Sequence, residues 1–322
     1  MSAPVLTNAL RPVLLAAGRS TRLERIITRL GLTRSLVQRF VPGAAESAVL
    51  AAAADLLASG RYVSVDHLGE DTTDGDRAEA TVQAYLSLLQ AYGTLTAPAV
   101  GSVEPLEVSI KLSALGQSRP EVGPGVALAN ARRICLAAAE RGAWVTVDAE
   151  DHTTTDSTLS IVCELRAEFP HLGTVLQAYL HRTEADCRDL SGPLSRIRLC
   201  KGAYAEPASV AFQRPAEVDA SYQRCLRVLM EGQGYPMVAT HDPAMITAAQ
   251  DLARQTSRSA EDFEFQMLYG IRDDEQRRLV AAGNQLRVYT PYGDQWYGYF
   301  MRRLAERPAN VLFFLRSLLS RS

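Results

Sequence analysis

Hydrophobic and polar positions alternate in two patterns along residues 60–292. Short runs rich in valine, isoleucine and leucine have the length and composition of buried strands. Longer segments with helical spacing of apolar residues separate them, and several of these end at a glycine. The candidate strands are residues 61–68, 106–113, 144–149, 174–180, 196–200, 237–241, 263–268 and 285–289.

This strict alternation predicts an α/β fold with parallel strands joined by right-handed crossovers. About eight strand-helix units indicate a closed (β/α)8 TIM-like barrel, and an open doubly wound sheet is the alternative. Polar side chains recur near the carboxyl ends of these strands, and in a closed barrel such ends meet on one face. They are Glu70, Lys111, Asp148, Gln177, Arg198, Lys201, Thr240, His241, Gln266, Tyr269 and Tyr289. Their predicted convergence favours the closed barrel and an enzyme over a binding scaffold.

Two adjacent arginines, Arg302 and Arg303, follow a group of aromatic residues near the end of the chain. Neighbouring helical residues project about 100° apart, so both can serve one function only if they bend toward a shared anion. Because guanidinium groups bind carboxylates with two parallel hydrogen bonds, a carboxylate or phosphate clamp is the first hypothesis. The alternative is a solvated helix face with salt bridges to Glu306.

Charged residues at three other strand ends add candidate chemistry. Lys111 lies among apolar neighbours, and a buried ammonium needs a carboxylate partner, for which Asp148 is the candidate. Such a pair could be catalytic or structural. Arg198 and Lys201 precede Gly202, where a ligand could approach the backbone, although Lys201 could instead be balanced by Glu206.

The segment THDP at residues 240–243 places a hydroxyl and an imidazole at another strand end, and its last two residues suit a helix start. A single histidine there is more often structural than catalytic. No HxH or HxxxH spacing accompanies the acidic residues 150–151, so we predict no metal site.

Composition and charge narrow the function classes. The 322 residues are 47% hydrophobic and 22% charged, and the net charge of −2 disfavours nucleic-acid binding. Residues 1–45 hold seven arginines and a single acid, a basic pattern that suits contact with an anionic membrane. The five cysteines show no CxxC spacing, so neither a zinc site nor a disulfide framework is expected.

No apolar run has the length of a membrane span, and residues 12–18 do not suit a secretory signal. We therefore expect a cytoplasmic protein with peripheral contact to the inner face of the cytoplasmic membrane. Neither a GxGxxG nor a GxxxxGK[ST] motif is present, so spacing alone names no cofactor.

Taken together, eight short motifs closely resemble those of the proline dehydrogenase family, in the same order and over roughly residues 60–310. They are IKLSALG (110–116), VDAED (147–151), QAYLHRT (177–183), RLCKGAY (198–204), ATHD (239–242), FQMLYG (265–270), RVYTPYG (287–293) and YFMRRLAE (299–306). Each motif alone is weak, and the combination is specific. Two departures are Asp242, where many relatives have Asn, and Ala149 in VDAED.

The resemblance implies a monofunctional bacterial-type enzyme with a distorted barrel that binds FAD. It implies hydride transfer from L-proline to flavin N5, which yields Δ1-pyrroline-5-carboxylate in the first step of proline catabolism. Electrons would pass to a membrane quinone, and the product to a separate pyrroline-5-carboxylate dehydrogenase. The expected division is an N-terminal helical arm at residues 1–58 and a catalytic barrel with a C-terminal helix at residues 59–322.

The family's site residues carry over position by position. Asp148 and Arg198 would be catalytic, with Arg198 beside flavin N5, and Glu70 would gate the substrate by pairing with Arg302. Substrate contacts would be Lys111, Tyr204, Leu268, Tyr289, Arg302 and Arg303. Cofactor contacts would be Ala149, Gln177, Arg198, Lys201, Gly202, Ala203, Thr240, His241 and Glu306.

The sequence leaves two competing functions open. A flavin barrel similar to methylenetetrahydrofolate reductase would accept electrons from NADH, although the arginine pair suits a small carboxylate better. A barrel without catalytic activity could serve as a binding scaffold, which the complete set of charged residues disfavours.

Overall fold

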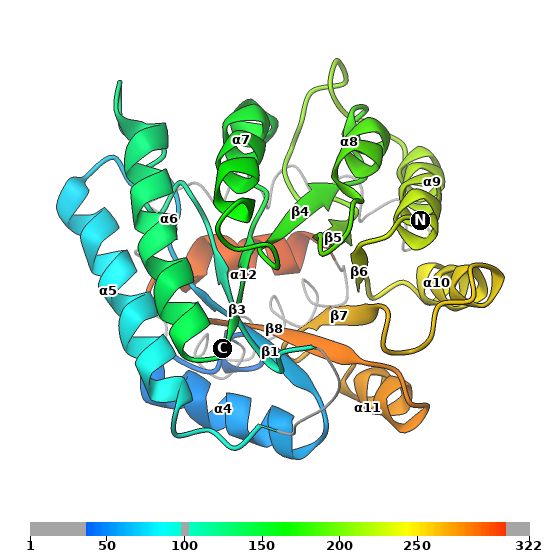
Figure 1. Ribbon diagram of the computed structural model, residues 1–322, viewed down its shortest axis with the longest axis horizontal. Coiled ribbons are helices and arrows are strands. Elements are labelled where there is room, and N and C mark those ends of the chain that lie inside the picture. Colours follow the sequence, from blue (N-terminus) through cyan, green and yellow to red (C-terminus); the bar gives the residue numbers. More distant parts are fainter. Residues whose placement is uncertain (1–36, 98–102, 307–322) are drawn as a thin grey trace, which may run out of the picture.

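A computed structural model describes residues 37–97 and 103–306 (Figure 1). Eight parallel strands form a closed barrel in sequential order, with β1 paired to β8. The strands are β1 (Tyr62–His67), β2 (Leu106–Ile110), β3 (Trp144–Val147), β4 (Gly173–Gln177), β5 (Arg196–Cys200), β6 (Tyr235–Ala239), β7 (Glu264–Leu268) and β8 (Leu286–Tyr292). The predicted barrel is therefore confirmed, and the open sheet is wrong.

Helices follow the strands and cover the barrel, as Figure 1 shows. They are α4 (Glu46–Ala58), α5 (Gly75–Tyr92), α6 (Gly123–Glu140), α7 (Thr155–Arg166), α8 (Thr183–Leu190), α9 (Pro215–Glu231), α10 (Pro243–Gln255), α11 (Asp273–Ala281) and α12 (Trp296–Glu306), with a short 3₁₀ helix at His152–Thr154. Helix α12 leaves the surrounding ring and crosses the barrel (Figure 1). This crossing brings the end of the described chain over the barrel opening.

Helix α4 precedes the first strand and packs against β1 and β8. The division at residue 58 stays a prediction. Of the basic segment 1–45 that is expected to contact a membrane, residues 1–36 lie outside the described part of the chain. Within the part that is described, no helix is long and apolar enough to cross a membrane.

Local sequence signals explain where several elements begin and end. Asp242 caps α10 by accepting a hydrogen bond from the backbone N–H of Ala244 at 2.9 Å, and Pro243 occupies the first turn. Such caps typically stabilise a helix by about 1 kcal/mol. The helix start predicted at THDP is therefore confirmed.

Two strand boundaries differ from the prediction. Strand β2 ends at Ile110, so Lys111 lies just past the strand rather than within it. Strand β8 continues through Pro291 to Tyr292, beyond the predicted strand end at residue 289. Proline lacks an N–H, but the Tyr292 carbonyl still accepts a hydrogen bond from Leu68 at 2.8 Å, so the pairing with β1 persists.

The interior of the barrel differs from its outside. Outward-facing apolar residues of the strands join the helices in one continuous hydrophobic core. Inward-facing positions carry buried polar and charged residues, including Ser64, Asp66, Glu107 and Ser109. Burying charges is costly unless they are paired, so these side chains must satisfy one another.

Candidate active site

A cavity of about 750 Å³ opens where the carboxyl ends of the strands meet α12. Its size falls within the range of small-molecule sites. The wall includes fifteen of the predicted site residues: Lys111, Asp148, Ala149, Gln177, Arg198, Lys201, Gly202, Ala203, Tyr204, Thr240, His241, Leu268, Tyr289, Arg302 and Arg303. Glu70 is not part of this wall, and the side chain of Glu306 lies outside the described residues. The sequence thus identified a set of residues that the fold brings together.

Lys111 is almost fully buried and lies between two carboxylates. Its Nζ is 2.7 Å from Oδ2 of Asp66 and 3.4 Å from Oδ2 of Asp148. Burial alone would lower the pKa of Lys111, but the two carboxylates outweigh it and leave the pKa raised, so the ammonium stays charged.

The predicted pairing with Asp148 is therefore confirmed, whereas the nearer partner, Asp66, was not predicted from the sequence. The signal that could have found it is the alternation within β1, where Ser64 and Asp66 are polar while Val63 and Val65 are apolar. Successive residues of a strand point to opposite faces, so these two polar residues had to face the interior.

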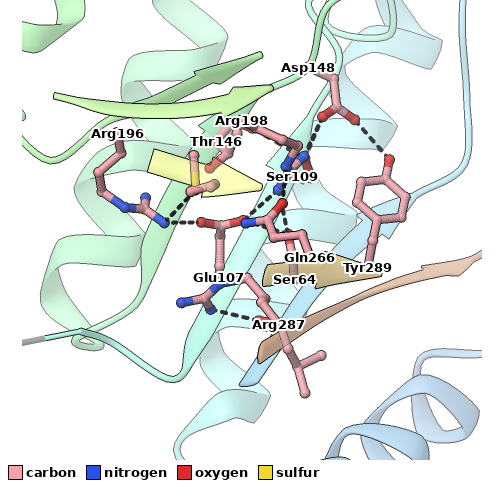
Figure 2. Close-up of polar contacts among 12 residues, drawn as sticks. Ser64, Glu107, Ser109, Thr146, Asp148, Arg196, Arg198, Gln266, Arg287 and Tyr289 are labelled. Atoms are coloured by element: carbon pink, nitrogen blue, oxygen red, sulfur yellow. Dashed lines mark hydrogen bonds and ion pairs between the residues drawn. The ribbon is translucent and has the colours of Figure 1, made fainter. Parts of the chain in front are cut away.

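Arg198 crosses the barrel interior from β5 and makes five hydrogen bonds (Figure 2). Its Nη1 donates to Asp148 at 2.7 Å and to Ser109 at 2.8 Å. Its Nη2 donates to Glu107 at 2.7 Å and to Ser64 at 3.3 Å, and its Nε donates to Gln266 at 2.5 Å. A guanidinium has five N–H groups, so all of them have acceptors within the protein and the group is held firmly.

Tyr289 contacts both Lys111 and Arg198 in the cavity wall. Its hydroxyl donates to Oδ2 of Asp148 at 2.8 Å and accepts from Lys111 at 3.2 Å. Its ring centroid lies 5.3 Å from the guanidinium carbon of Arg198. Burial raises the pKa of Tyr289 well above its ordinary value, and the negative charge of Asp148 raises it further. The phenol therefore stays protonated and acts as a donor.

The arginine pair of α12 lines the cavity rather than a solvated face. Arg302 forms a two-point ion pair with Glu70, one contact being 3.1 Å, and its guanidinium lies 5.7 Å from the ring of Tyr204. Burial would lower the pKa of Arg302, but Glu70 outweighs it and leaves the pKa raised. The guanidinium of Arg303 lies 5.1 Å from the ring of Tyr299. The interpretation as a solvated helix face is wrong for Arg302, whose ion pair is with Glu70. The predicted salt bridges to Glu306 involve a side chain outside the described residues.

Around Lys201, the structure replaces the expected partner. The ammonium lies 2.5 Å from Asp219 and 2.7 Å from Asp242, so the pairing with Glu206 considered from the sequence is wrong. Glu206 instead accepts hydrogen bonds from His152 and from Tyr179, the latter at 3.3 Å. The segment after β5 is therefore tied to α9 and to the cap of α10 by the ion pairs of Lys201.

Gly202 has a backbone conformation that side chains rarely adopt, with φ of +108°. A Cβ atom at this position would lie 2.3 Å from the ring of Tyr179. Glycine is therefore required here, and the cavity wall at this position is bare backbone.

Two further wall residues are held by the backbone around them. The Nε2 of His241 accepts a hydrogen bond from the backbone N–H of Leu268 at 2.9 Å, which fixes the imidazole ring beside the end of β7. Gln177 donates to the carbonyl of Glu150 at 2.8 Å. These contacts order the wall, as preorganised binding sites require.

Comparisons with known proteins agree with this geometry. The family model described as proline dehydrogenase matches residues 49–316. The proline dehydrogenase of Deinococcus radiodurans is 40% identical over 287 residues, covering 88% of this chain and 90% of that protein. Proline dehydrogenase 1 of Bacillus subtilis is 36% identical over 312 residues, covering 97% of this chain and 100% of that protein.

Solved structures share the fold. Proline utilization A of Bdellovibrio bacteriovorus, inactivated by N-propargylglycine, superposes with a TM-score of 0.77 at 24% identity and matches 92% of this chain. A proline utilization A structure from Bradyrhizobium japonicum superposes with a TM-score of 0.70 at 23% identity over the same share of this chain. The matched region spans 36% and 34% of those longer chains.

Proposed function

This chain belongs to the proline dehydrogenase family, and we propose that it oxidises L-proline to Δ1-pyrroline-5-carboxylate with a bound FAD. The reaction is the first step of proline breakdown. One observation carries the proposal: Lys111, Arg302 and Arg303 come from distant parts of the chain and line a single cavity. A small carboxylate with a saturated ring is the ligand that such a cavity suits.

The three cations hold the substrate carboxylate in this proposal. Arg302 and Arg303 supply planar donors, and Lys111 supplies a charge whose orientation Asp66 fixes at 2.7 Å. Apolar and aromatic surface from Tyr204, Leu268 and Tyr289 surrounds the pyrrolidine ring. The cavity thus offers charged groups to the substrate carboxylate and apolar or aromatic surface to its ring.

Glu70 acts as a gate over this clamp. It is paired to Arg302 outside the cavity wall, so the pair can shield the bound substrate from water while Arg302 still faces the cavity. Excluding water strengthens each electrostatic contact with the substrate.

The rest of the wall fits a flavin dinucleotide. Bare backbone at Gly202 allows a flat ligand to approach closely, and the cations Arg198 and Lys201 suit its phosphates and electron-rich ring edge. The remaining cofactor contacts in this proposal are Ala149, Gln177, Ala203, Thr240 and His241, with Glu306 as a further contact. When bound, the flavin would supply the oxidising power by accepting a hydride at N5.

The chain's own part is to position and to manage charge. Arg198 is one of the two catalytic residues and is placed beside the cofactor ring. Because all its N–H groups already have acceptors, contact with the cofactor requires one of them to be shared, and the 3.3 Å bond to Ser64 is the longest. Asp148 is the other, and it orients Arg198, Tyr289 and Lys111 together. Holding reacting atoms in contact can contribute roughly 7 to 11 kcal/mol to the lowering of a barrier.

The same cations favour the neutral amine of bound proline, because a positive environment disfavours an ammonium. Loss of a hydride from the ring carbon beside nitrogen then forms the C=N bond, with the nitrogen lone pair supplying its electrons. If the pH dependence of proline oxidation shows no ionisation attributable to the amine, this part of the proposal is wrong.

The reduced enzyme passes its electrons to a membrane quinone in this proposal, and a separate pyrroline-5-carboxylate dehydrogenase receives the product. Peripheral contact with the cytoplasmic face of the membrane would bring the enzyme to its quinone.

The test is anaerobic addition of substrate to the purified protein. A yellow flavin spectrum should be bleached by L-proline and not by NADH. Bleaching by NADH alone would instead favour a reductase of the methylenetetrahydrofolate type, and absence of flavin would favour a scaffold.

A further inference from the structure

A chain of alternating charges runs from the bottom of the barrel to the cavity (Figure 2). At its lower end, Oε2 of Glu107 accepts from Arg196 at 2.5 Å. Oε1 of the same carboxylate accepts from Arg198 at 2.7 Å, and Arg198 then reaches Asp148 at 2.7 Å. Asp148 in turn forms an ion pair with Lys111. The charged residues at the barrel bottom are therefore connected, through successive ion pairs, to those that line the cavity.

Glu107 is fully buried and does not belong to the cavity wall. Burial raises the pKa of its carboxyl, but Arg196, Arg287 and Arg198 outweigh burial and leave the pKa below its ordinary value. The group is therefore ionised at any working pH. Its two oxygens are divided between a structural cation, Arg196, and a cation that faces the ligand, Arg198.

We propose that Glu107 is a positioning residue for the active site, which fixes Arg198 from below and neutralises part of its charge. The proposal rests on the proposed function, because it concerns the charge that the flavin experiences. A purely structural ion pair would need only Arg196. The second hydrogen bond of Glu107, from Arg198, connects the barrel bottom to a residue that lines the cavity.

The consequence is a shift in redox behaviour that stability alone would not produce. Without the carboxylate, the charge of Arg198 is balanced by Asp148 only, and Asp148 is already shared with Lys111 and Tyr289. The cavity becomes more positive, which favours the reduced, electron-rich flavin. The midpoint potential of the bound flavin should therefore rise.

The test compares Glu107→Gln with Glu264→Gln. Glu264 is an equally buried carboxylate at the barrel bottom, paired with Arg287 at 2.8 Å, and an amide there can still accept from Gln266. The control therefore removes a similar charge and leaves each hydrogen bond of Arg198 in place.

For Glu107→Gln we expect at least a tenfold change in the ratio of reduced to oxidised flavin, which is about +30 mV for a two-electron couple. Glu264→Gln should lower the melting temperature and shift the potential much less. Equal shifts in the two variants, or no shift in Glu107→Gln, would overturn the proposal.

Two further variants cover a failure to fold. Glu107→Gln combined with Arg196→Met removes both charges of the lower pair, and because Arg198 still loses its partner, the potential should rise, by less than in Glu107→Gln alone. Glu107→Asp keeps the charge but draws it away from Arg198, so a smaller rise is expected. An unchanged potential in every folded variant would refute the role of Glu107. The wild-type protein separates the two proposals, because a wild type without flavin or without bleaching by proline refutes the proposed function itself.

Discussion

The bottom and the mouth of the barrel contain the same kinds of charged side chain in different surroundings. At the bottom, the floor cluster of Glu107, Arg196, Glu264 and Arg287 is fully buried, and its ion pairs join residues at or near the starts of strands. At the mouth, the clamp consists of Lys111, Arg302 and Arg303, which line a cavity. A cation that a ligand can reach is available to bind it, whereas a charge buried below the cavity acts on the ligand only through its partners.

The clamp also differs in how its positions are fixed. Floor residues lie on strands, so their positions follow from the register of the barrel. Arg302 and Arg303 lie on α12, and Arg302 pairs with Glu70 in the loop after β1. In such barrels the amino-terminal face mainly serves stability, and the chemistry gathers at the carboxyl-terminal face.

The strongest test of the floor is Arg287→Met. This change leaves Glu264 buried without its guanidinium, and breaking a buried pair typically costs about 3 to 5 kcal/mol. Urea unfolding should show this loss, while the turnover of the folded enzyme changes little. A variant that keeps its stability but loses turnover would contradict the structural role of Arg287.

The corresponding test of the clamp is Arg303→Ala. Loss of one charged contact with the substrate carboxylate should lower kcat/KM by roughly 100-fold to 1,000-fold, at about 1.4 kcal/mol for each factor of ten. The flavin spectrum and the unfolding midpoint should change little. Arg277→Ala is the control, because Arg277 is an exposed arginine on α11 outside the cavity wall. Equal effects from both substitutions would remove Arg303 from the clamp.

A third test concerns Glu150, a buried carboxyl beside the mouth that accepts hydrogen bonds from Ser113. Burial raises its pKa to about 7, and the hydrogen bonds from Ser113 only partly oppose this. A carboxyl with a raised pKa contributes full stability below its unfolded pKa, near 4.5, and loses that contribution as pH rises through 7.

Glu150→Gln removes this titration. Relative to the wild type, the variant should gain roughly 3 kcal/mol of unfolding free energy between pH 4.5 and pH 8. Urea unfolding at both pH values measures the difference. Glu79→Gln is the control, because the pKa of exposed Glu79 is lowered to about 2 by hydrogen bonds from Arg133 and Gln83. A gain of the same size in the control would contradict the explanation.

The sequence predicted most of the fold and the composition of the cavity wall. Strand-helix alternation predicted the α/β class, because each strand needed only its own apolar run and breaking residues, and the polar strand ends favoured the closed barrel over the open sheet. Motif order was sufficient for the wall. The floor cluster was not predicted, since each of its residues looks like an isolated charge in a strand, and only the closed barrel brings Glu107 within 2.5 Å of Arg196.

Partners across the barrel were the other gap. Lys111 was paired with Asp148 because the two follow neighbouring strands, but Asp66 on the other neighbouring strand is closer. Lys201 was considered with Glu206 because they are near in sequence, and its partners come from α9 and from the cap of α10. Local sequence distance ranks partners poorly where strands bring distant residues to one face.

The smallest expected effect concerns Asp242, which connects the mouth to a helix cap. Asp242→Asn keeps the cap on Ala244 but removes one of the two carboxylates that hold Lys201. The pair is partly exposed, and such pairs contribute about 0.2 to 1 kcal/mol, so stability should barely change. Lys201 then becomes more available to an anionic cofactor, and the affinity for FAD, measured by quenching of flavin fluorescence, should rise about twofold to fivefold.

Asp251→Asn removes an exposed ion pair on the same helix, away from the cavity, and should leave FAD affinity unchanged. Weaker FAD binding in Asp242→Asn would show that Asp242 orients Lys201 for the cofactor rather than competing with the cofactor for it. Asp242 would then position a cation at the mouth of the barrel, as Glu107 is proposed to position Arg198 from the bottom.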